Sequence, residues 1–114
     1  MSNLLEKNCT ACEIGAPLVP EEDQVLLLKD LQGWEIDSLD ISKLVKVFKF
    51  SNYKQSLQFT NLIGDLAELE DHHPKITLEW GEVSLEWWSH KIKGLHMNDF
   101  ICAAKSDEIY KSLN

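Results

Sequence analysis

The chain has 114 residues, of which 44% are hydrophobic and 26% charged, and its formal net charge is -8. This length suits one domain with a single core and leaves no room for separate cofactor and substrate domains. All 11 basic residues are lysines, and arginine is the side chain that pairs best with phosphates and guanine edges. Nucleic acids and polyphosphates are therefore disfavoured ligands. With no apolar run that could span a bilayer and no signal-peptide pattern, we expect a cytoplasmic protein.

Residues 1–19 show little periodicity, which predicts a loosely structured leader before a single domain at residues 20–114. Cys9 and Cys12 lie in this leader, and Cys102 is the third cysteine. An odd number of cysteines without a secretory signal disfavours a disulfide framework. A zinc site at Cys9 and Cys12 would need two more ligands, so we interpret them as two thiols on a mobile leader.

The first predicted helix follows Pro20, where proline and three acidic residues suit a helix N-terminus, and it ends before Gly33. Its apolar stripe comprises Val25, Leu26, Leu28 and Leu31. Beyond it, residues 34–37 alternate apolar and polar side chains, and residues 44–50 are rich in valine and phenylalanine. Turn-forming residues separate the two segments, which predicts a β-hairpin.

A longer amphipathic helix is predicted from Asn52 to about His72, because apolar residues recur there at helical spacing. Those residues are Phe59, Leu62, Ile63, Leu66 and Leu69. Proline disfavours the helical conformation in the residue before it, so Pro74 predicts that His73 is extended and that the helix stops at the histidine pair. We expect this to be the principal helix of the core.

Residues 76–80 and 83–87 alternate apolar and polar side chains on either side of Gly81, which predicts a second hairpin. Continuing the alternation places Trp88 and His90 on the face opposite to the apolar residues. A last helix is predicted to open at Asn98 and Asp99. The order α-β-β-α-β-β-α indicates a two-layer α+β domain, in which helices cover one face of a four-stranded, mostly antiparallel sheet.

His72, His73 and His90 border the predicted junctions between helices and strands. Histidine gives or takes a proton near neutral pH, so this cluster favours acid/base chemistry. Glu68 lies four residues before His72 on the predicted helix, where its carboxylate would orient that imidazole. On spacing alone, acid/base catalysis ranks slightly behind the simpler interpretation, in which the histidines are surface or capping residues and Glu68 forms a solvated ion pair with His72. Zinc ranks below acid/base chemistry because adjacent histidines diverge and no HExxH or HxH spacing is present. His96 is interpreted as structural or peripheral, since a helix cap or a solvent contact would explain it.

In order and spacing, these residues resemble the pterin-4a-carbinolamine dehydratase family, and its bacterial members in particular. The resemblance rests on Trp34, Phe48, Lys49, Phe50, Phe59, Ala67, Glu68, His72, His73, Pro74, Trp80, Val83, Ser89, His90, Gly94, Leu95 and Asp99. The leader is also similar to that of bacterial relatives associated with phenylalanine hydroxylase. The residues that carry this similarity are Cys9, Cys12, Ala16 and Pro17.

The resemblance implies a hydro-lyase that converts 4a-hydroxytetrahydrobiopterin, or pterin-4a-carbinolamine, to quinonoid dihydropterin and water. This reaction recycles the pterin cofactor of aromatic amino-acid hydroxylation. The resemblance implies a catalytic site of His72, His73 and His90, with His72 and His90 as the leading acid and base candidates. It also implies that Glu68 orients His72 and that Asp99 supports His90. The implied substrate-binding residues are Asp71, Pro74, Trp88, Ser89, Lys91 and Asp99.

The implied partners are the pterin substrate, further copies of the chain in a homodimer or homotetramer, and a functional link to phenylalanine hydroxylase. No metal or additional cofactor is expected, because the pterin is the substrate. Trp88 stands where animal relatives often have a small residue, and Ser89 where threonine is common, so we expect pocket shape to differ more than mechanism. Animal relatives also act as dimerisation cofactors of a homeodomain transcription factor. The alternative function is therefore a protein-binding regulatory module for a hydroxylase or a transcription factor.

Overall fold

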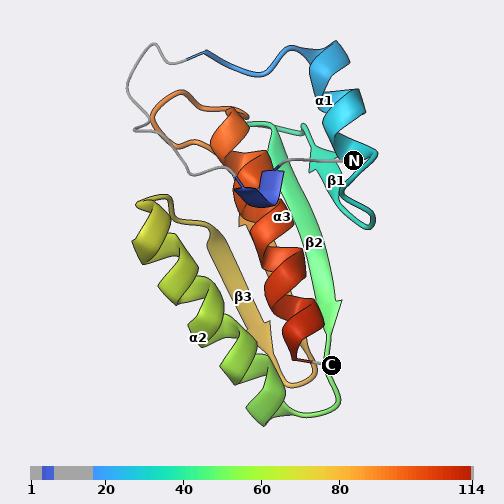
Figure 1. The fold of residues 1–114 in the computed structure, drawn as a ribbon, viewed down its shortest axis with the longest axis vertical. Helices are drawn as coiled ribbons and strands as arrows, with labels where there is room; N and C mark the ends of the chain where they lie inside the picture. The colour runs from blue at the N-terminus through green and yellow to red at the C-terminus, as the bar shows by residue number, and fades with distance from the viewer. Residues whose placement is uncertain (1–3, 7–16, 114) are drawn as a thin grey trace.

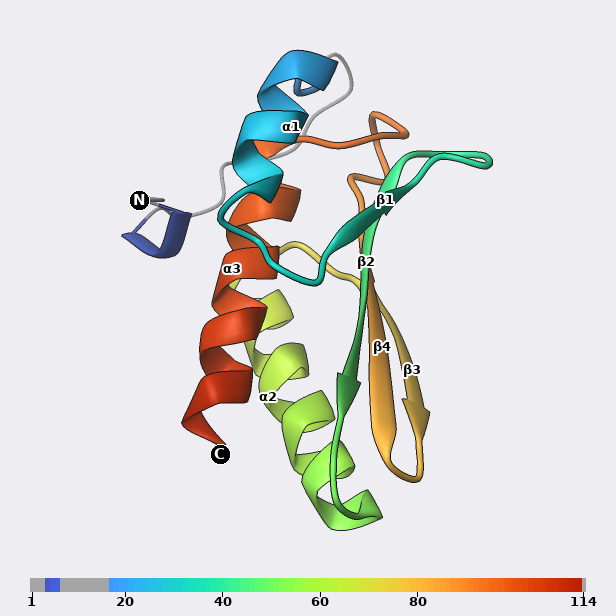
Figure 2. The ribbon, with the colours of Figure 1, turned by 90° about the vertical axis from the view of Figure 1, so that its right-hand side faces the viewer.

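The computed structural model describes residues 4–6 and 17–113, and its helices and strands form two layers (Figures 1 and 2). In chain order the elements are the 3-10 helix η1 (Leu4–Glu6), α1 (Glu21–Leu28), β1 (Glu35–Asp37), β2 (Lys43–Lys49), α2 (Tyr53–Glu70), β3 (Lys75–Glu79), β4 (Glu82–Trp87) and α3 (Met97–Ser112). The strands form a four-stranded antiparallel sheet in the order β1-β2-β4-β3. Because α2 and α3 pack on the same face of this sheet, the predicted α+β fold is confirmed.

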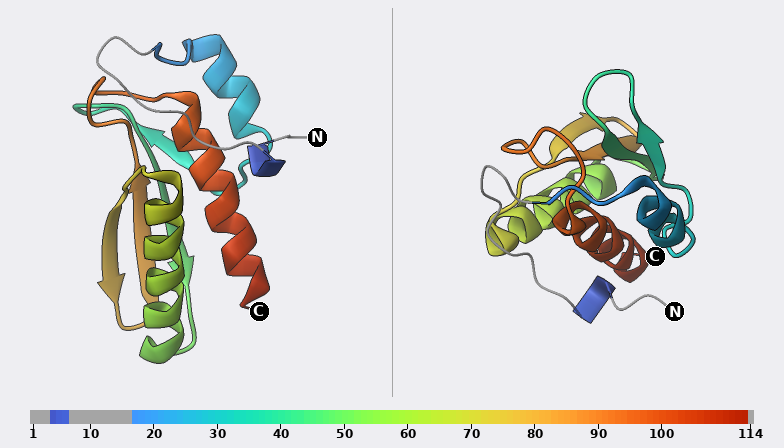
Figure 3. Two further views of the ribbon diagram at one scale, coloured as in Figure 1. Left: turned by 60° about the vertical axis from the view of Figure 1, so that its left-hand side comes forward. Right: turned by 90° about the horizontal axis from the view of Figure 1, so that it is seen from above.

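Most of the predicted leader, residues 1–3 and 7–16 with Cys9 and Cys12, lies outside the described residues. Within it, η1 packs against α3, and Leu4 is buried in the core (Figure 3). Residues 17–20 lead into α1, and the Val19 N–H donates to the Leu95 carbonyl oxygen at 2.9 Å. The entry to the domain is therefore attached to the turn that precedes α3.

The α1 helix begins after Pro20 with three acidic residues in its first turn, as predicted, but it ends earlier, at Leu28. Val25 and Leu26 are 60% and 58% exposed, so the predicted apolar stripe was wrong for these two residues. Leu31 is buried although it lies beyond the helix, because tight turns at residues 29–31 direct the chain inward. A helix of this length contacts the core only through its last residues.

Both predicted hairpins are confirmed, as β1 with β2 and as β3 with β4. The central pair is β2 with β4, in which Phe48 lies opposite Val83. Strict alternation places Val83, Leu85 and Trp87 of β4 on the helix side of the sheet, where none of them is exposed. Trp80 continues the apolar pattern in sequence but is 68% exposed, because β3 ends at Glu79 and Trp80 lies in the hairpin turn.

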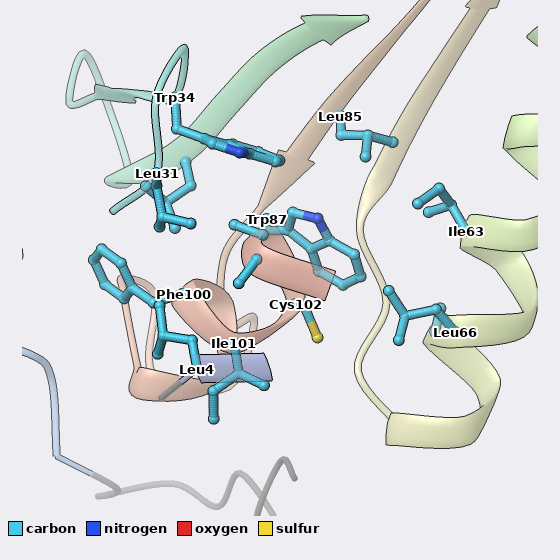
Figure 4. Packing of buried hydrophobic residues seen from close by; sticks show 14 of the residues in the cluster. Leu4, Leu31, Trp34, Ile63, Leu66, Leu85, Trp87, Phe100, Ile101 and Cys102 are labelled. Carbon is cyan, nitrogen blue, oxygen red and sulfur yellow. The ribbon is translucent and has the colours of Figure 1, made fainter. Parts of the chain in front are cut away.

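The α2 helix is the principal core helix, as predicted. Asn52 caps its first turn by accepting a hydrogen bond from the Gln55 N–H at 2.9 Å. Its inner face packs on the sheet through Phe59, Ile63, Leu66 and Ala67. Leu69 is 80% exposed, so its assignment to the core face was wrong. Figure 4 shows Ile63 and Leu66 beside Trp87, which lies near the centre of the buried cluster.

The α3 helix starts one residue before the predicted Asn98, and its N-cap is His96. The His96 side chain accepts a hydrogen bond from the Asn98 N–H at 3.0 Å through Nδ1, so of the two expected roles, cap or solvent contact, the structure shows the cap. From there α3 crosses the core, where Phe100, Cys102 and Ala103 are unexposed. Among the described residues, no helix is both long and apolar enough to cross a membrane.

Candidate active site

Hydrogen bonds join four element ends, because α2 and β4 finish where β3 and α3 begin. The junction of α2 with β3 and the start of α3 can be followed in Figure 1. The histidine pair lies between α2 and β3, and His90 lies in the turn after β4. Asp99 is in the first turn of α3. The fold therefore brings together side chains that are far apart in the sequence.

The exit from α2 determines where the histidine pair points. Asp71 adopts the left-handed conformation at φ 50° and ψ 44° as the C-cap, and the His72 N–H donates to the Ala67 carbonyl oxygen at 3.1 Å. The helix thus stops at Glu70, close to the boundary expected from Pro74. Because His72 has left the helical path, the helical neighbour relation between Glu68 and His72 no longer holds.

His72 is buried at 6% exposure, and its partner is Asp99 rather than Glu68. The distance from His72 Nε2 to Asp99 Oδ1 is 2.6 Å. The His72 ring also stacks on Trp87, with ring centroids 5.7 Å apart and an interplanar angle of 10°. The implied pairings of Glu68 with His72 and of Asp99 with His90 were therefore wrong.

His73 and Glu68 form the pair closest to solvent. His73 Nε2 lies 2.5 Å from Glu68 Oε2, and the two side chains are 54% and 79% exposed. The left-handed turn at Asp71 brings the next histidine along the chain over this carboxylate. The Glu68 carboxylate is therefore placed to orient His73, which a ligand can reach from solvent.

His90 is exposed and contacts the histidine pair through the backbone. Its Nε2 donates to the His73 carbonyl oxygen at 3.2 Å. The His90 ring lies 4.3 Å from the Trp88 ring, and the Lys43 ammonium lies 4.5 Å from the centroid of the same indole. Trp88 and His90 are on the sheet face expected from the alternation, whereas sequence analysis missed Lys43, which is brought there by its place on β2 opposite the end of β4.

Ser89 is unexposed and lies behind the histidines rather than on an accessible surface. Its hydroxyl donates to Asp99 Oδ2 at 2.8 Å. The His96 N–H donates to the same oxygen at 2.9 Å as part of the capping box that starts α3. Asp99 has no exposed surface and accepts from three donors, so Ser89, Asp99 and His72 form a buried network.

The remaining predicted substrate-binding residues lie along the same turns. Asp71 and Lys91 are exposed, and Pro74 is half-buried between the histidine pair and β3. Neither the Asp71 nor the Lys91 side chain forms a hydrogen bond or ion pair with any residue that the structure describes. Within residues 4–6 and 17–113, no three histidine, cysteine or acidic side chains converge as metal ligands would.

Comparison with known proteins places the chain in a family. The family model for pterin 4 alpha carbinolamine dehydratase matches residues 16–109. Relatives that carry this family's name include one from Marinobacter nauticus, 50% identical over 96% of this chain and 100% of its own length, and one from Saccharophagus degradans, 45% identical over 97% and 99%.

Two solved structures share the fold. A transcriptional coactivator/pterin dehydratase from Brucella melitensis aligns with a TM-score of 0.78 at 23% identity, over 82% of this chain and 99% of its own. A pterin dehydratase-like protein identified as a RuBisCO assembly factor aligns with a TM-score of 0.61 at 22% identity, over 71% and 93%.

Proposed function

The chain belongs to the pterin 4 alpha carbinolamine dehydratase family, and on that premise we propose that it dehydrates 4a-hydroxytetrahydrobiopterin to quinonoid dihydropterin by histidine acid/base catalysis. The observation that carries the proposal is the convergence of His72, His73 and His90, each with its Nε2 bound to a protein acceptor. The reaction would recycle the pterin cofactor of aromatic amino-acid hydroxylation. A homodimer or homotetramer, a link to phenylalanine hydroxylase and a cytoplasmic location stay predictions.

The proposed reaction needs one acid and one base. The acid protonates the 4a-hydroxyl as the C4a–O bond breaks and water leaves, and the base takes the proton from N5. The electron pair of the N5–H bond then forms the C=N bond, so atoms and charge balance without a metal or a covalent nucleophile. Positioned side chains of this kind contribute about 10²- to 10⁴-fold to a rate.

The hydrogen bonds favour Nδ1 as the reacting nitrogen of each ring. A carbonyl oxygen only accepts, so His90 Nε2 carries a proton, and the acidic partners of His72 and His73 support the same tautomer. No described residue hydrogen-bonds to the Nδ1 atom of any of the three rings. In the neutral ring, the lone pair is then on Nδ1, which is free to exchange a proton with the substrate.

We assign the base to His72. When its Nδ1 takes up the N5 proton, the Asp99 carboxylate behind Nε2 stabilises the imidazolium that forms, as in the serine protease triad. The acid is then one of the two exposed histidines. Trp88 is the stacking candidate for the pterin ring, since its indole lies beside His90 on the same sheet face.

The test is the rate of 4a-carbinolamine dehydration with the parent protein and with His72→Ala, His73→Ala and His90→Ala. We expect the parent to accelerate dehydration above the spontaneous rate, and loss of the base or the acid to remove about 10²- to 10⁴-fold of that acceleration. His96→Asn is the matched control, because asparagine retains the cap of α3.

Two results would contradict the proposal. The first is a parent protein that leaves the spontaneous rate unchanged while it co-purifies with a hydroxylase, which would favour the regulatory module. The second is a full parental rate in all three variants. Circular dichroism of each variant is the control that checks whether the fold is intact.

A further inference from the structure

We infer that Ser89 is a positioning residue: with the His96 N–H it fixes the Asp99 carboxylate, which holds the His72 ring with Nε2 toward the protein and Nδ1 toward the substrate. This inference rests on the proposed function for its catalytic consequence. It replaces the role of substrate contact that the resemblance implies for Ser89, because this side chain has no exposed surface.

The two oxygens of the Asp99 carboxylate have different partners: one accepts the hydrogen bonds that fix the carboxylate, and the other binds His72. Oδ2 accepts from the Ser89 hydroxyl at 2.8 Å and from the His96 N–H at 2.9 Å. Oδ1 accepts from His72 Nε2 at 2.6 Å. Two donors from different directions fix the plane of the carboxylate, and the plane fixes the direction in which Oδ1 points at the imidazole.

Both holding donors are themselves attached to rigid backbone. The His96 N–H belongs to the capping box at the start of α3. Ser89 lies in an antiparallel bridge with Gly94, where each N–H donates to the carbonyl oxygen of the other residue at 2.9 and 3.4 Å. The turn after β4 and the first turn of α3 therefore set the position of Asp99 together.

The His72 ring has two constraints, and each controls a different motion. Stacking on Trp87 at 10° between planes restricts tilting of the ring. The bond from Nε2 to Asp99 restricts rotation within the plane and selects the tautomer. Removing the Ser89 hydroxyl leaves Oδ2 with one donor, so the carboxylate gains freedom to rotate and the second constraint weakens.

The main test is Ser89→Ala in the dehydration assay. Loss of a partner that orients a catalytic side chain typically costs about 10- to 100-fold, and we expect this loss in kcat. KM should change by less than about threefold, because Ser89 touches no substrate. Ser89→Thr retains the hydroxyl and should restore kcat to within about threefold of the parent.

Ser56→Ala is the matched control, since Ser56 is equally unexposed and donates to two carbonyl oxygens at the far end of α2. It should lower stability without changing kcat. A Ser89→Ala protein with parental kcat, or with a raised KM and unchanged kcat, would overturn the inference.

Nitrogen-15 NMR of labelled histidine gives a readout that does not depend on activity, and its first part uses the parent protein alone. In the parent, His72 should carry its proton on Nε2 in the neutral form, and Ser89→Ala should broaden or shift that signal while the His96 signal stays in place. A parent His72 protonated on Nδ1 contradicts the inference. A parent with the Nε2–H tautomer but no dehydratase activity contradicts the proposed function instead.

Discussion

Replacing Asp99 with asparagine should move a proton on His72 without changing the shape of the site. The Ser89 hydroxyl and the His96 N–H both donate to Oδ2, so the amide oxygen of an asparagine must occupy that place. The amide NH₂ then takes the place of Oδ1 and donates to His72 Nε2. The ring proton moves to Nδ1, which can no longer accept a proton from the substrate.

The magnitude follows from the tautomer. In the serine protease triad, the aspartate-to-asparagine change lowers kcat about 10⁴-fold by imposing the wrong histidine tautomer, and we expect a fall of about 10³- to 10⁴-fold for Asp99→Asn. The free energy of unfolding should fall by less than the loss of all three hydrogen bonds would cause. Hydrogen bonds to a charged group contribute about 1.5–3 kcal/mol each and those between neutral groups about 1 kcal/mol. The Ser89 hydroxyl and the His96 N–H keep their acceptor, and His72 Nε2 becomes the acceptor of the amide NH₂.

The assay is steady-state dehydration together with nitrogen-15 NMR of His72 and urea denaturation. Asp107→Asn is the matched control on the same helix, because its carboxylate accepts from Trp34 Nε1 and Lys46 Nζ away from the histidines. The control should lose stability and keep kcat. If a folded Asp99→Asn protein retains parental kcat, or if His72 keeps its proton on Nε2, the reasoning is wrong.

Glu68→Gln retains an acceptor for His73, and because both side chains are mostly exposed, the free energy of unfolding should change by less than about 1 kcal/mol in urea denaturation; a larger loss would mean that the pair is structural. Trp88→Ala removes the stacking surface and should raise KM about 3- to 10-fold in steady-state assays, whereas an unchanged KM would exclude stacking on the pterin. Leu66→Ala should lower the free energy of unfolding by about 2–5 kcal/mol. Leu69→Ala, at 80% exposure, should cost less than about 0.5 kcal/mol, and equal losses in the two leucine variants would contradict the assigned core face.

The order of helices and strands could be predicted because the sequence repeats its apolar residues with clear periods. Alternation identified β4, and Pro74 placed the end of α2 within a few residues. The errors at Val25, Leu26 and Leu69 have a common cause. An apolar residue shows that a helix has an apolar side, but the neighbouring elements decide which side is covered. The α1 helix contacts the core through Leu27 and Leu28, which leaves Val25 and Leu26 exposed.

The three histidines singled out from the sequence do lie together, but their side-chain partners differ from the predicted ones. Spacing along a helix linked Glu68 to His72, and one left-handed residue, Asp71, was enough to move that carboxylate to His73 instead. The true partner of His72 lies 27 residues further along the chain, across the junction of α2 with α3. Contacts of this kind depend on tertiary packing, and no local pattern in the sequence reports them.

The most direct measurement of the central claim is the pH dependence of kcat for 4a-carbinolamine dehydration, in the parent and in single histidine variants. Acid/base catalysis by histidine predicts a bell-shaped parental profile. The residual activity of His72→Ala should lose the limb that reports the base, and one of His73→Ala and His90→Ala should lose the other. Profiles of parental shape in all three variants would contradict the account.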